Sequence, residues 1–214
     1  MQVIVMAAQK GGAGKTTLAL HLAVEYSRVG KSVALIDTDP QKSAEMWGNL
    51  RDADDITVAA IPAAEIAAAL RDAEADGFDM VIVDTPPHAS AALAPVLRLA
   101  TLVVVPFKPS PLDLATLDTI TRIITAAGTP AVAVISSAPV RAAENEPMRE
   151  AIQAGGLRVL KTVIHDRMPF RRSIGNGLAV TEFDPKGTGA KEIQALRVEI
   201  DQEITSLANE AITS

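Results

Sequence analysis

A glycine-rich loop that directly follows the first apolar run narrows the possible folds of this chain more than any other segment does. The run Val3–Met6 predicts a buried strand, and an apolar helical pattern through Leu18 and Leu22 follows the loop. The loop residues between them are Gly11, Gly12, Ala13, Gly14, Lys15, Thr16 and Thr17. Strand, glycine loop and helix in this order are the context of a phosphate-binding loop, so the segment predicts a nucleotide site.

The residue types in the loop suit Mg-ATP. Glycines let backbone N–H groups converge on phosphate oxygens, and the helix N-terminus adds a partial positive charge. Lys15 can neutralise the β- and γ-phosphates, and the Thr16 hydroxyl can bind Mg²⁺. The alternative is an ordinary glycine turn with an incidental lysine, and the joint match of loop, lysine, threonine and flanking elements argues against it. We therefore expect ATP and Mg²⁺ as cofactors.

Short β-branched runs alternate with longer segments of helical spacing along the chain. The runs are residues 3–6, 33–36, 57–61, 80–83, 102–105, 131–135 and 158–164. Such runs are typical of strands buried on both faces of a parallel sheet, with helices crossing between them. The expected fold is α/β, a three-layer sandwich with a mostly parallel central sheet and ligands at the carboxyl ends of its strands. The length of 214 residues fits one domain over residues 1–214.

Two helices have ends that can be read from the sequence. Ser110 is an N-cap candidate, Pro111 suits the first helical position and Asp113 suits the first turn, and Gly128 ends the pattern. A final helix is expected over residues 190–211. Its apolar stripe consists of Ile193, Leu196, Ile200, Ile204 and Leu207.

Composition excludes several classes of protein. The chain has no cysteine, which excludes disulfides, thiolate catalysis and iron-sulfur ligation. The formal net charge of −6 and the 3% aromatic content are unlike a basic nucleic-acid binder, so any nucleic-acid contact should be local. No apolar run approaches the roughly 20 residues that cross a bilayer, and no N-terminal leader is evident, so a cytoplasmic protein is expected. The histidines, which are His21, His88 and His165, share no metal-ligand spacing.

Acidic residues follow two of the predicted strands. Asp37 and Asp39 come directly after the run 33–36, and Asp84 follows the run 80–83. Acids at the carboxyl ends of neighbouring strands would lie beside the phosphate loop, where Mg²⁺ prefers hard oxygen ligands. Taken singly, such acids could equally cap turns.

The loop departs from the general phosphate-loop pattern in an informative way. The position five residues before Gly14, usually glycine, is Gln9, and an additional lysine stands at Lys10. With this form, Lys10 to Thr17 resembles the ParA/MinD family of deviant Walker-type ATPases, and the chain is most similar to small ParA-like plasmid-partition ATPases. The resemblance extends over nearly the whole chain and implies the P-loop NTPase fold of the deviant Walker type.

The resemblance assigns catalytic roles to Lys10, Lys15 and Asp39. Lys10 would reach across a nucleotide-sandwich dimer to the partner's phosphates, and Asp39 would position the attacking water. Asp84 matches the Walker B aspartate and Asp37 a switch aspartate, so both are expected near the metal with Thr16. Spacing alone does not distinguish such a trans-acting lysine from a solvated one.

Three further segments gain candidate roles from the resemblance. Residues 106–113 would help to form the dimer face, and Pro185 is a candidate for contact with the adenine base. DNA binding is assigned to an arginine cluster. Its members are Arg167, Arg171 and Arg172. A solvated charged surface is the open alternative for this cluster.

The function implied is that of a partition or cargo-positioning ATPase. Mg-ATP would drive homodimerisation and binding to non-specific DNA, and a ParB-like or other adaptor protein would stimulate a slow ATPase activity and release. The protein would be cytoplasmic and associated with the nucleoid.

Two alternatives use the same loop. A MinD-like positioning ATPase would dock on membranes through a basic amphipathic tail, whereas residues 204–214 contain Glu210 and no lysine or arginine, so no membrane partner is expected. A metabolic P-loop ligase of the dethiobiotin-synthetase type remains open. It would turn over rapidly without DNA or a partner protein.

Overall fold

The computed structural model describes residues 1–87, 93–141 and 143–213. The strands are β1 (Gln2–Met6), β2 (Val33–Asp37), β3 (Thr57–Ala60), β4 (Met80–Asp84), β5 (Leu102–Phe107), β6 (Ala131–Ala138) and β7 (Arg158–His165). The helices are α1 (Lys15–Arg28), α2 (Ser43–Leu50), α3 (Ile66–Ala75), α4 (Ala94–Leu97), α5 (Pro111–Leu114), α6 (Leu117–Ala127), α7 (Asn145–Ala154), α8 (Met168–Ile174), α9 (Val180–Phe183) and α10 (Thr188–Thr213). Every strand predicted from the sequence is confirmed, with ends that differ by one to three residues.

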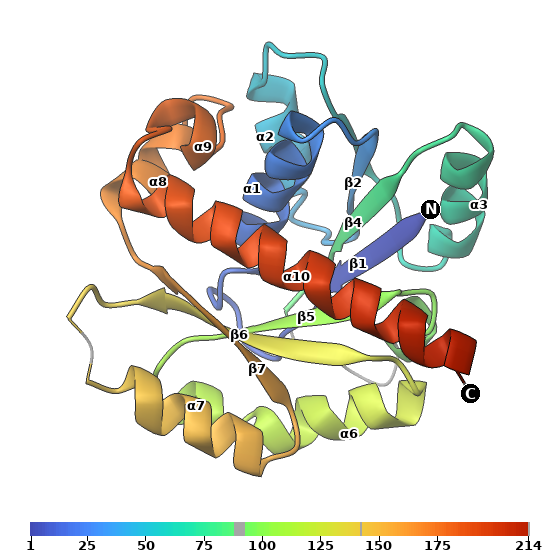
Figure 1. Ribbon diagram of the computed structural model, residues 1–214. Coiled ribbons are helices and arrows are strands. Elements are labelled where there is room, and N and C mark those ends of the chain that lie inside the picture. The colour runs from blue at the N-terminus through green and yellow to red at the C-terminus, as the bar shows by residue number, and fades with distance from the viewer. Residues whose placement is uncertain (88–92, 142, 214) are drawn as a thin grey trace.

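The strands form one seven-stranded sheet in the order β3-β2-β4-β1-β5-β6-β7 (Figure 1). All neighbouring pairs are parallel, so the carboxyl ends of all strands lie at one edge. β1, which leads into the glycine loop, lies in the middle of the sheet. The loop is therefore flanked by the ends of β4 on one side and β5 on the other.

Helices cover both faces of the sheet and bury two apolar cores (Figure 1). One core packs α1, α2 and α10 against the sheet, and the other packs α3, α4, α6 and α7 against the opposite face. The alternating side chains of each strand divide between the two cores, as in Val3 and Val5 against Ile4 and Met6. The predicted three-layer sandwich is confirmed.

The helix predicted from Ser110 to Gly128 is wrong in one respect, because it is two helices. Ser110 caps α5 as expected, with its side chain accepting a hydrogen bond from the Asp113 N–H, and Gly128 ends α6 in the left-handed conformation. The break lies between them, where the Thr116 hydroxyl donates to the Asp113 carbonyl at 2.7 Å. The Thr116 side chain thus bonds back to the preceding turn, as Thr side chains often do, and Thr116 is the N-cap residue of α6.

The C-terminal helix α10 confirms the predicted apolar stripe and crosses the face of the sheet that α1 covers (Figure 1). Ile193, Leu196, Ile200 and Ile204 are buried in that core, and Leu207 packs against it. In the described part of the chain, no helix combines the length and the apolarity needed to cross a membrane.

His21 lies in α1 inside the core and is held in its neutral form. Its Nδ1 accepts the Val180 N–H at 3.1 Å, and the ring of Phe170 packs edge-on at 5.0 Å between centroids. Burial lowers the pKa of His21 from 6.5 to about 3. At pH values between about 3 and 6.5, the His21 side chain binds a proton in the unfolded chain but not in the folded chain. The contribution of the buried neutral His21 to folding stability is therefore fully present above pH 6.5 and is lost as the pH falls below it.

We predict that replacing His21 by Asn flattens the loss of stability in mild acid. Asn keeps a side-chain acceptor for the Val180 N–H and does not titrate. The free energy of unfolding of the wild type should fall relative to the variant by up to about 1.4 kcal/mol per pH unit below pH 6.5. Urea unfolding of both proteins from about pH 7.5 to pH 5 measures this difference, in which the other titrating groups cancel. Parallel curves would contradict the assignment.

Candidate functional site

The glycine loop has the backbone geometry of an anion cradle. Gly12 and Gly14 have positive φ values of 74° and 103°, and Gly14 precedes the first residue of α1 without a side-chain cap. A Cβ at Gly14 would lie 2.4 Å from Ser136 Oγ, so that only glycine fits against β6. The first N–H groups of α1 thus remain available to an anion at the helix N-terminus.

Lys15 is buried beneath the loop with only 6% of its surface exposed. Burial lowers the pKa of its ammonium group, and the negative charges of Asp84 and Asp39 act in the opposite direction. The lysine is therefore within the electrostatic reach of two of the predicted acids. A triphosphate bound in the loop would add the negative charge that a buried ammonium group requires.

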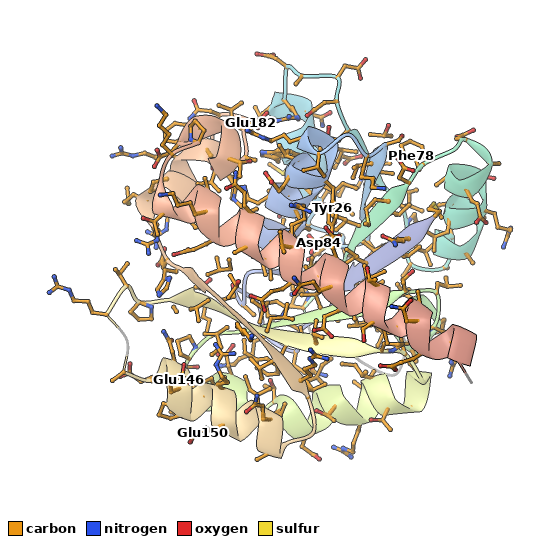
Figure 2. All side chains as sticks on the ribbon, in the orientation of Figure 1. Tyr26, Phe78, Asp84, Glu146, Glu150 and Glu182 are labelled. Carbon is orange, nitrogen blue, oxygen red and sulfur yellow. The ribbon has the colours of Figure 1, made fainter. Side chains whose placement is uncertain are left out.

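Thr16 and Asp84 form the pair of hard oxygen donors at this site. The Thr16 hydroxyl donates to Asp84 Oδ2 at 2.6 Å. Asp84, labelled in Figure 2, is the last residue of β4 and is fully buried. Asp84 Oδ1 is buried without a hydrogen-bond partner among the described residues. Burial is the main cause that raises the pKa of Asp84 to about 7. An orphaned carboxylate oxygen next to a threonine hydroxyl fits Mg²⁺, which prefers oxygen ligands.

Strand register brings Asp37 to the same level as Asp84. Asp37 pairs with Asp84 across β2 and β4, as Met6 does across β1 and β4. The Asp37 carboxylate accepts the N–H groups of Ala44 at 2.7 Å and Asp39 at 2.9 Å. It thus holds the start of α2, and its role as a metal ligand stays a prediction.

Asp39 lies in the turn between β2 and α2 and is half-buried. Its Oδ1 accepts the Gln41 N–H at 2.9 Å, which fixes the turn locally. Thr38 ties the same turn to the sheet, because its hydroxyl donates to the Asp84 carbonyl at 2.8 Å. The turn that carries Asp39 is therefore anchored beside Asp84 and Lys15.

Lys10 contacts an acid of its own chain. Its Nζ lies 3.8 Å from Asp113 Oδ2, and Asp113 also accepts a hydrogen bond from Ser110 Oγ at 2.7 Å. The segment 106–113 thus lies against the loop. Lys108 also approaches it, since its Nζ would lie 3.7 Å from a Cβ at Gly12. Lys108 is a third cation at the loop, after Lys10 and Lys15, and it was not predicted from the sequence, although its position directly after a buried strand was a usable signal.

A recess of about 200 Å³ opens next to the start of α1. Its walls come from the ends of β5, β6 and β7 and from α8. They include Thr17, Lys108, Ser136, Ser137, His165 and Asp166. Ser137 has a positive φ of 51°, an unusual conformation for a residue other than glycine. Pro185, predicted to contact the base, is exposed between α9 and α10 and is not among the described residues that line this recess.

The arginine cluster predicted to bind DNA lies in and next to α8, but its members differ in state. Arg167 pairs with Glu192 at 2.8 Å and has a side chain only 22% exposed. Arg171 pairs with Asp166 and has a side chain 67% exposed, and Arg172 is exposed. Arg171 and Arg172 are thus accessible on the surface, whereas Arg167 is held in an ion pair.

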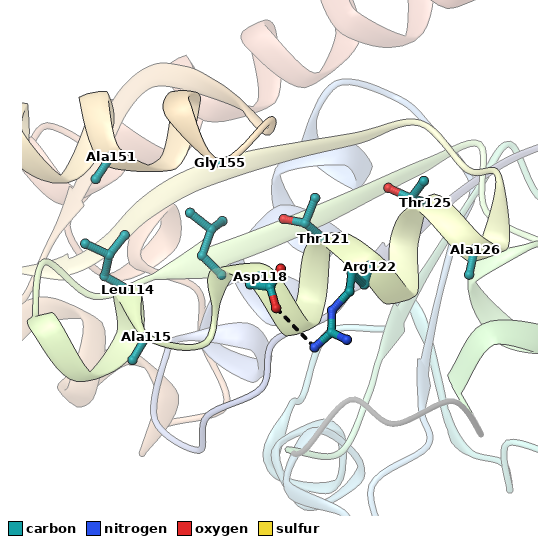
Figure 3. Close-up of a pocket in the computed structure, with 10 residues that line it drawn as sticks. Leu114, Ala115, Asp118, Thr121, Arg122, Thr125, Ala126, Ala151 and Gly155 are labelled. Carbon is teal, nitrogen blue, oxygen red and sulfur yellow. Dashed lines mark ion pairs between the residues drawn. The ribbon is translucent and has the colours of Figure 1, made fainter.

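A larger recess of about 620 Å³ lies apart from the loop, between α6 and α7 (Figure 3). It carries Thr121 and an exposed ion pair between Asp118 and Arg122 at 3.1 Å. We assign it no chemistry. His88, another candidate considered in the sequence, lies outside the described residues.

Comparison with known proteins gives consistent matches. The family described as the CobQ/CobB/MinD/ParA nucleotide binding domain matches residues 4–180. The maintenance of carboxysome distribution protein A of Gloeobacter kilaueensis is 32% identical over 200 residues, covering 91% of this chain and 89% of the relative. Protein ParA of Rhizobium radiobacter is 35% identical over 115 residues, which are 53% of this chain and 51% of the relative.

A solved structure shows the same fold at low sequence identity. The septum site-determining protein MinD of Pyrococcus horikoshii, complexed with Mg-ADP, superposes with a TM-score of 0.79. The match has 14% identity and covers 96% of this chain and 98% of that one.

Proposed function

Because the chain belongs to the CobQ/CobB/MinD/ParA family of nucleotide-binding proteins, we propose that it is a positioning ATPase switched by Mg-ATP. The main support is the phosphate loop, where the buried Lys15 lies beside the Thr16–Asp84 pair. ATP would bind with its phosphates on the N–H groups from Gly11 to Lys15 and on the ammonium group of Lys15.

The magnesium ion would be held by Thr16 and Asp84. Asp37 would be the third residue near the metal, because strand register places it level with Asp84. Bound there, Mg²⁺ would offset the charge that develops on the phosphates during hydrolysis. Asp39 would position the attacking water, because its turn is anchored beside Asp84. Positioning of this kind supplies most of what phosphoryl transfer needs from a protein.

We further propose that ATP drives formation of a homodimer in which Lys10 acts in trans. In the single chain, Lys10 is 3.8 Å from Asp113, so dimerisation would exchange this contact for the partner's phosphates. The side chain of Lys10 is 37% exposed, which leaves it accessible to a partner. The segment 106–113 lies next to Lys10 and would form part of the same face.

Cargo positioning is favoured over ligase chemistry by a relative that spans most of the chain. The Gloeobacter protein, named for carboxysome distribution, matches nine-tenths of both sequences. We propose that the present chain is a cargo-positioning ATPase that works in the cytoplasm at the nucleoid, with an adaptor protein that stimulates slow hydrolysis. A ligase would instead turn over rapidly without such partners, which a basal ATPase assay distinguishes.

We propose that the ATP-bound dimer binds DNA without sequence preference. Arg171 and Arg172 are exposed on α8, and a two-fold dimer would present both of them twice. Phosphate contacts from such arginines can act locally in a chain with a net charge of −6. Arg167 is the weaker candidate because its side chain is 22% exposed and paired with Glu192, whose side chain is 11% exposed, whereas Arg171, although paired with Asp166, is 67% exposed.

We predict that the protein binds random-sequence duplex DNA in the presence of ATP and releases it in the presence of ADP. Affinity should fall steeply as salt rises, because each arginine–phosphate contact displaces counterions. Replacing both Arg171 and Arg172 by Glu should reduce the affinity at least about tenfold at low salt. Fluorescence anisotropy at several salt concentrations measures this, with Arg122→Glu on the opposite face of the sheet as the matched control. Binding that ignores nucleotide or salt would contradict this part of the proposal.

A further inference from the structure

The recess beside the start of α1 holds a side chain arrangement that can distinguish one purine base from another. This inference rests on the proposed function, since it concerns the base of the nucleotide whose phosphates occupy the loop. β5, β6 and β7 lie successively further from β1. Neighbouring strands are about 4.8 Å apart, so the end of β7 lies about 14 Å from the phosphate loop that follows β1. That span suits the distance between the phosphates and the base of an extended nucleotide.

His165 lies at this far end of the recess, at the last position of β7. Its Nδ1 is 2.8 Å from Glu192 Oε1, and its backbone N–H donates to Glu192 Oε2 at 3.1 Å. Arg167 donates to Glu192 Oε1 from both Nε at 3.1 Å and Nη2 at 2.8 Å. Glu192, which lies on α10, is therefore held in place by four contacts with His165 and Arg167.

These contacts fix which ring nitrogen of His165 carries the proton. A carboxylate can only accept hydrogen bonds, so Nδ1 must be the donor toward Glu192. Arg167 already supplies the positive charge that balances this carboxylate. With Nδ1 as the donor to Glu192, Nε2 is the ring nitrogen that remains to accept a hydrogen bond from a ligand.

The other polar groups of the recess discriminate less between bases. The hydroxyls of Ser136 and Ser137 can each donate or accept. The Lys108 ammonium group lies beside Gly12 at the phosphate end, and the Arg171 guanidinium is paired with Asp166. The Asp166 carboxylate is also an acceptor, but its Oδ2 is occupied by Arg171 and its side chain is 45% exposed. His165 is 21% exposed and held by Glu192, so it is the better fixed acceptor to select a hydrogen-bond donor on a base.

We propose that His165, oriented by Glu192, is a specificity residue that accepts a hydrogen bond from the exocyclic amine of adenine. Adenine carries a donor at its six-position, whereas guanine and hypoxanthine carry a carbonyl acceptor there. An acceptor on the base would face the lone pair of His165 and leave both groups unpaired. The recess therefore selects ATP over nucleotides with a six-oxo base.

The test compares Mg-ATP with Mg-ITP, whose base has a carbonyl in place of the amine. Calorimetry on the full chain should show ATP binding at least about tenfold more tightly than ITP. His165→Ala should reduce this ratio to within about twofold, mainly through weaker ATP binding. Lys191→Ala, which removes an exposed lysine next to Glu192 on α10, should keep the wild-type ratio. The inference is overturned if folded His165→Ala keeps the wild-type preference, or if Asp166→Ala alone removes it.

A second measurement does not depend on a variant. The ¹⁵N chemical shifts of the His165 imidazole in the wild type should identify Nδ1 as the nitrogen that carries the proton toward Glu192 and Nε2 as the acceptor. A proton on Nε2 would overturn the inference even where ATP is preferred. If the wild type binds neither ATP nor ITP, the proposed function itself fails, which separates that outcome from a loss of base selection.

Discussion

Lys15→Ala will remove measurable binding of Mg-ATP while leaving the fold intact. Lys15 is 6% exposed and lies under the loop, where burial lowers the pKa of its ammonium group. Its removal takes away a buried cation that would oppose the triphosphate charge. A charge-assisted contact of this kind is worth about 3 kcal/mol, so we expect a loss in affinity of at least about 100-fold. Equilibrium dialysis with labelled ATP measures it.

The matched control for this variant is Lys31→Ala, which removes an exposed lysine after α1. It should bind Mg-ATP as the wild type does. Circular dichroism and thermal unfolding would show whether each variant is folded. Unchanged ATP affinity in a folded Lys15→Ala variant would contradict the placement of the phosphates on this loop.

Asp39→Ala will bind Mg-ATP but hydrolyse it at least about 100-fold more slowly. Asp39 lies in a turn that Thr38 anchors to the Asp84 carbonyl, so its loss removes a positioned carboxylate without opening the sheet. Since ATP would remain bound, the proposed dimer should accumulate. Phosphate release measures hydrolysis, and gel filtration with ATP, ADP and no nucleotide measures the dimer.

Asp52→Ala is the control for that experiment, because Asp52 is an exposed acid beyond the end of α2. It should hydrolyse ATP at the wild-type rate and show the wild-type elution profile. Normal hydrolysis by Asp39→Ala would make the assigned water-positioning role wrong. A monomer under all three conditions would remove the switch from the proposal and leave the nucleotide site in place.

Much of the fold could be predicted because its determinants are local. The β-branched runs buried on both faces predicted the strands, and the glycine loop predicted the junction of β1 and α1. Because Asp37 and Asp84 directly follow two of the predicted strands, the sequence predicted that they lie close together, and the register of β2 and β4 confirms this. The stripe along α10 was readable for the same reason, since one helix face is apolar.

The remaining features depend on contacts between residues far apart in the sequence. The pairing of Arg167 with Glu192 joins positions 25 residues apart and was invisible in a cluster that looked uniformly basic. The break between α5 and α6 is the exception, because it lies at a local contact in which the Thr116 hydroxyl donates to the Asp113 carbonyl, and the spacing of the apolar residues does not reveal it. Lys108 gains its place at the loop only when β5 and β1 lie side by side.

One measurement tests the nucleotide site most directly. Titration of Mg-ATP into the purified wild-type chain in a calorimeter should give a saturable heat with one site per chain, and Lys15→Ala should abolish it. A wild-type titration that gives no heat at more than one temperature, together with no ATP retained in dialysis, would contradict ATP binding at the phosphate loop. The proposed ATP-driven switch would then fail with it.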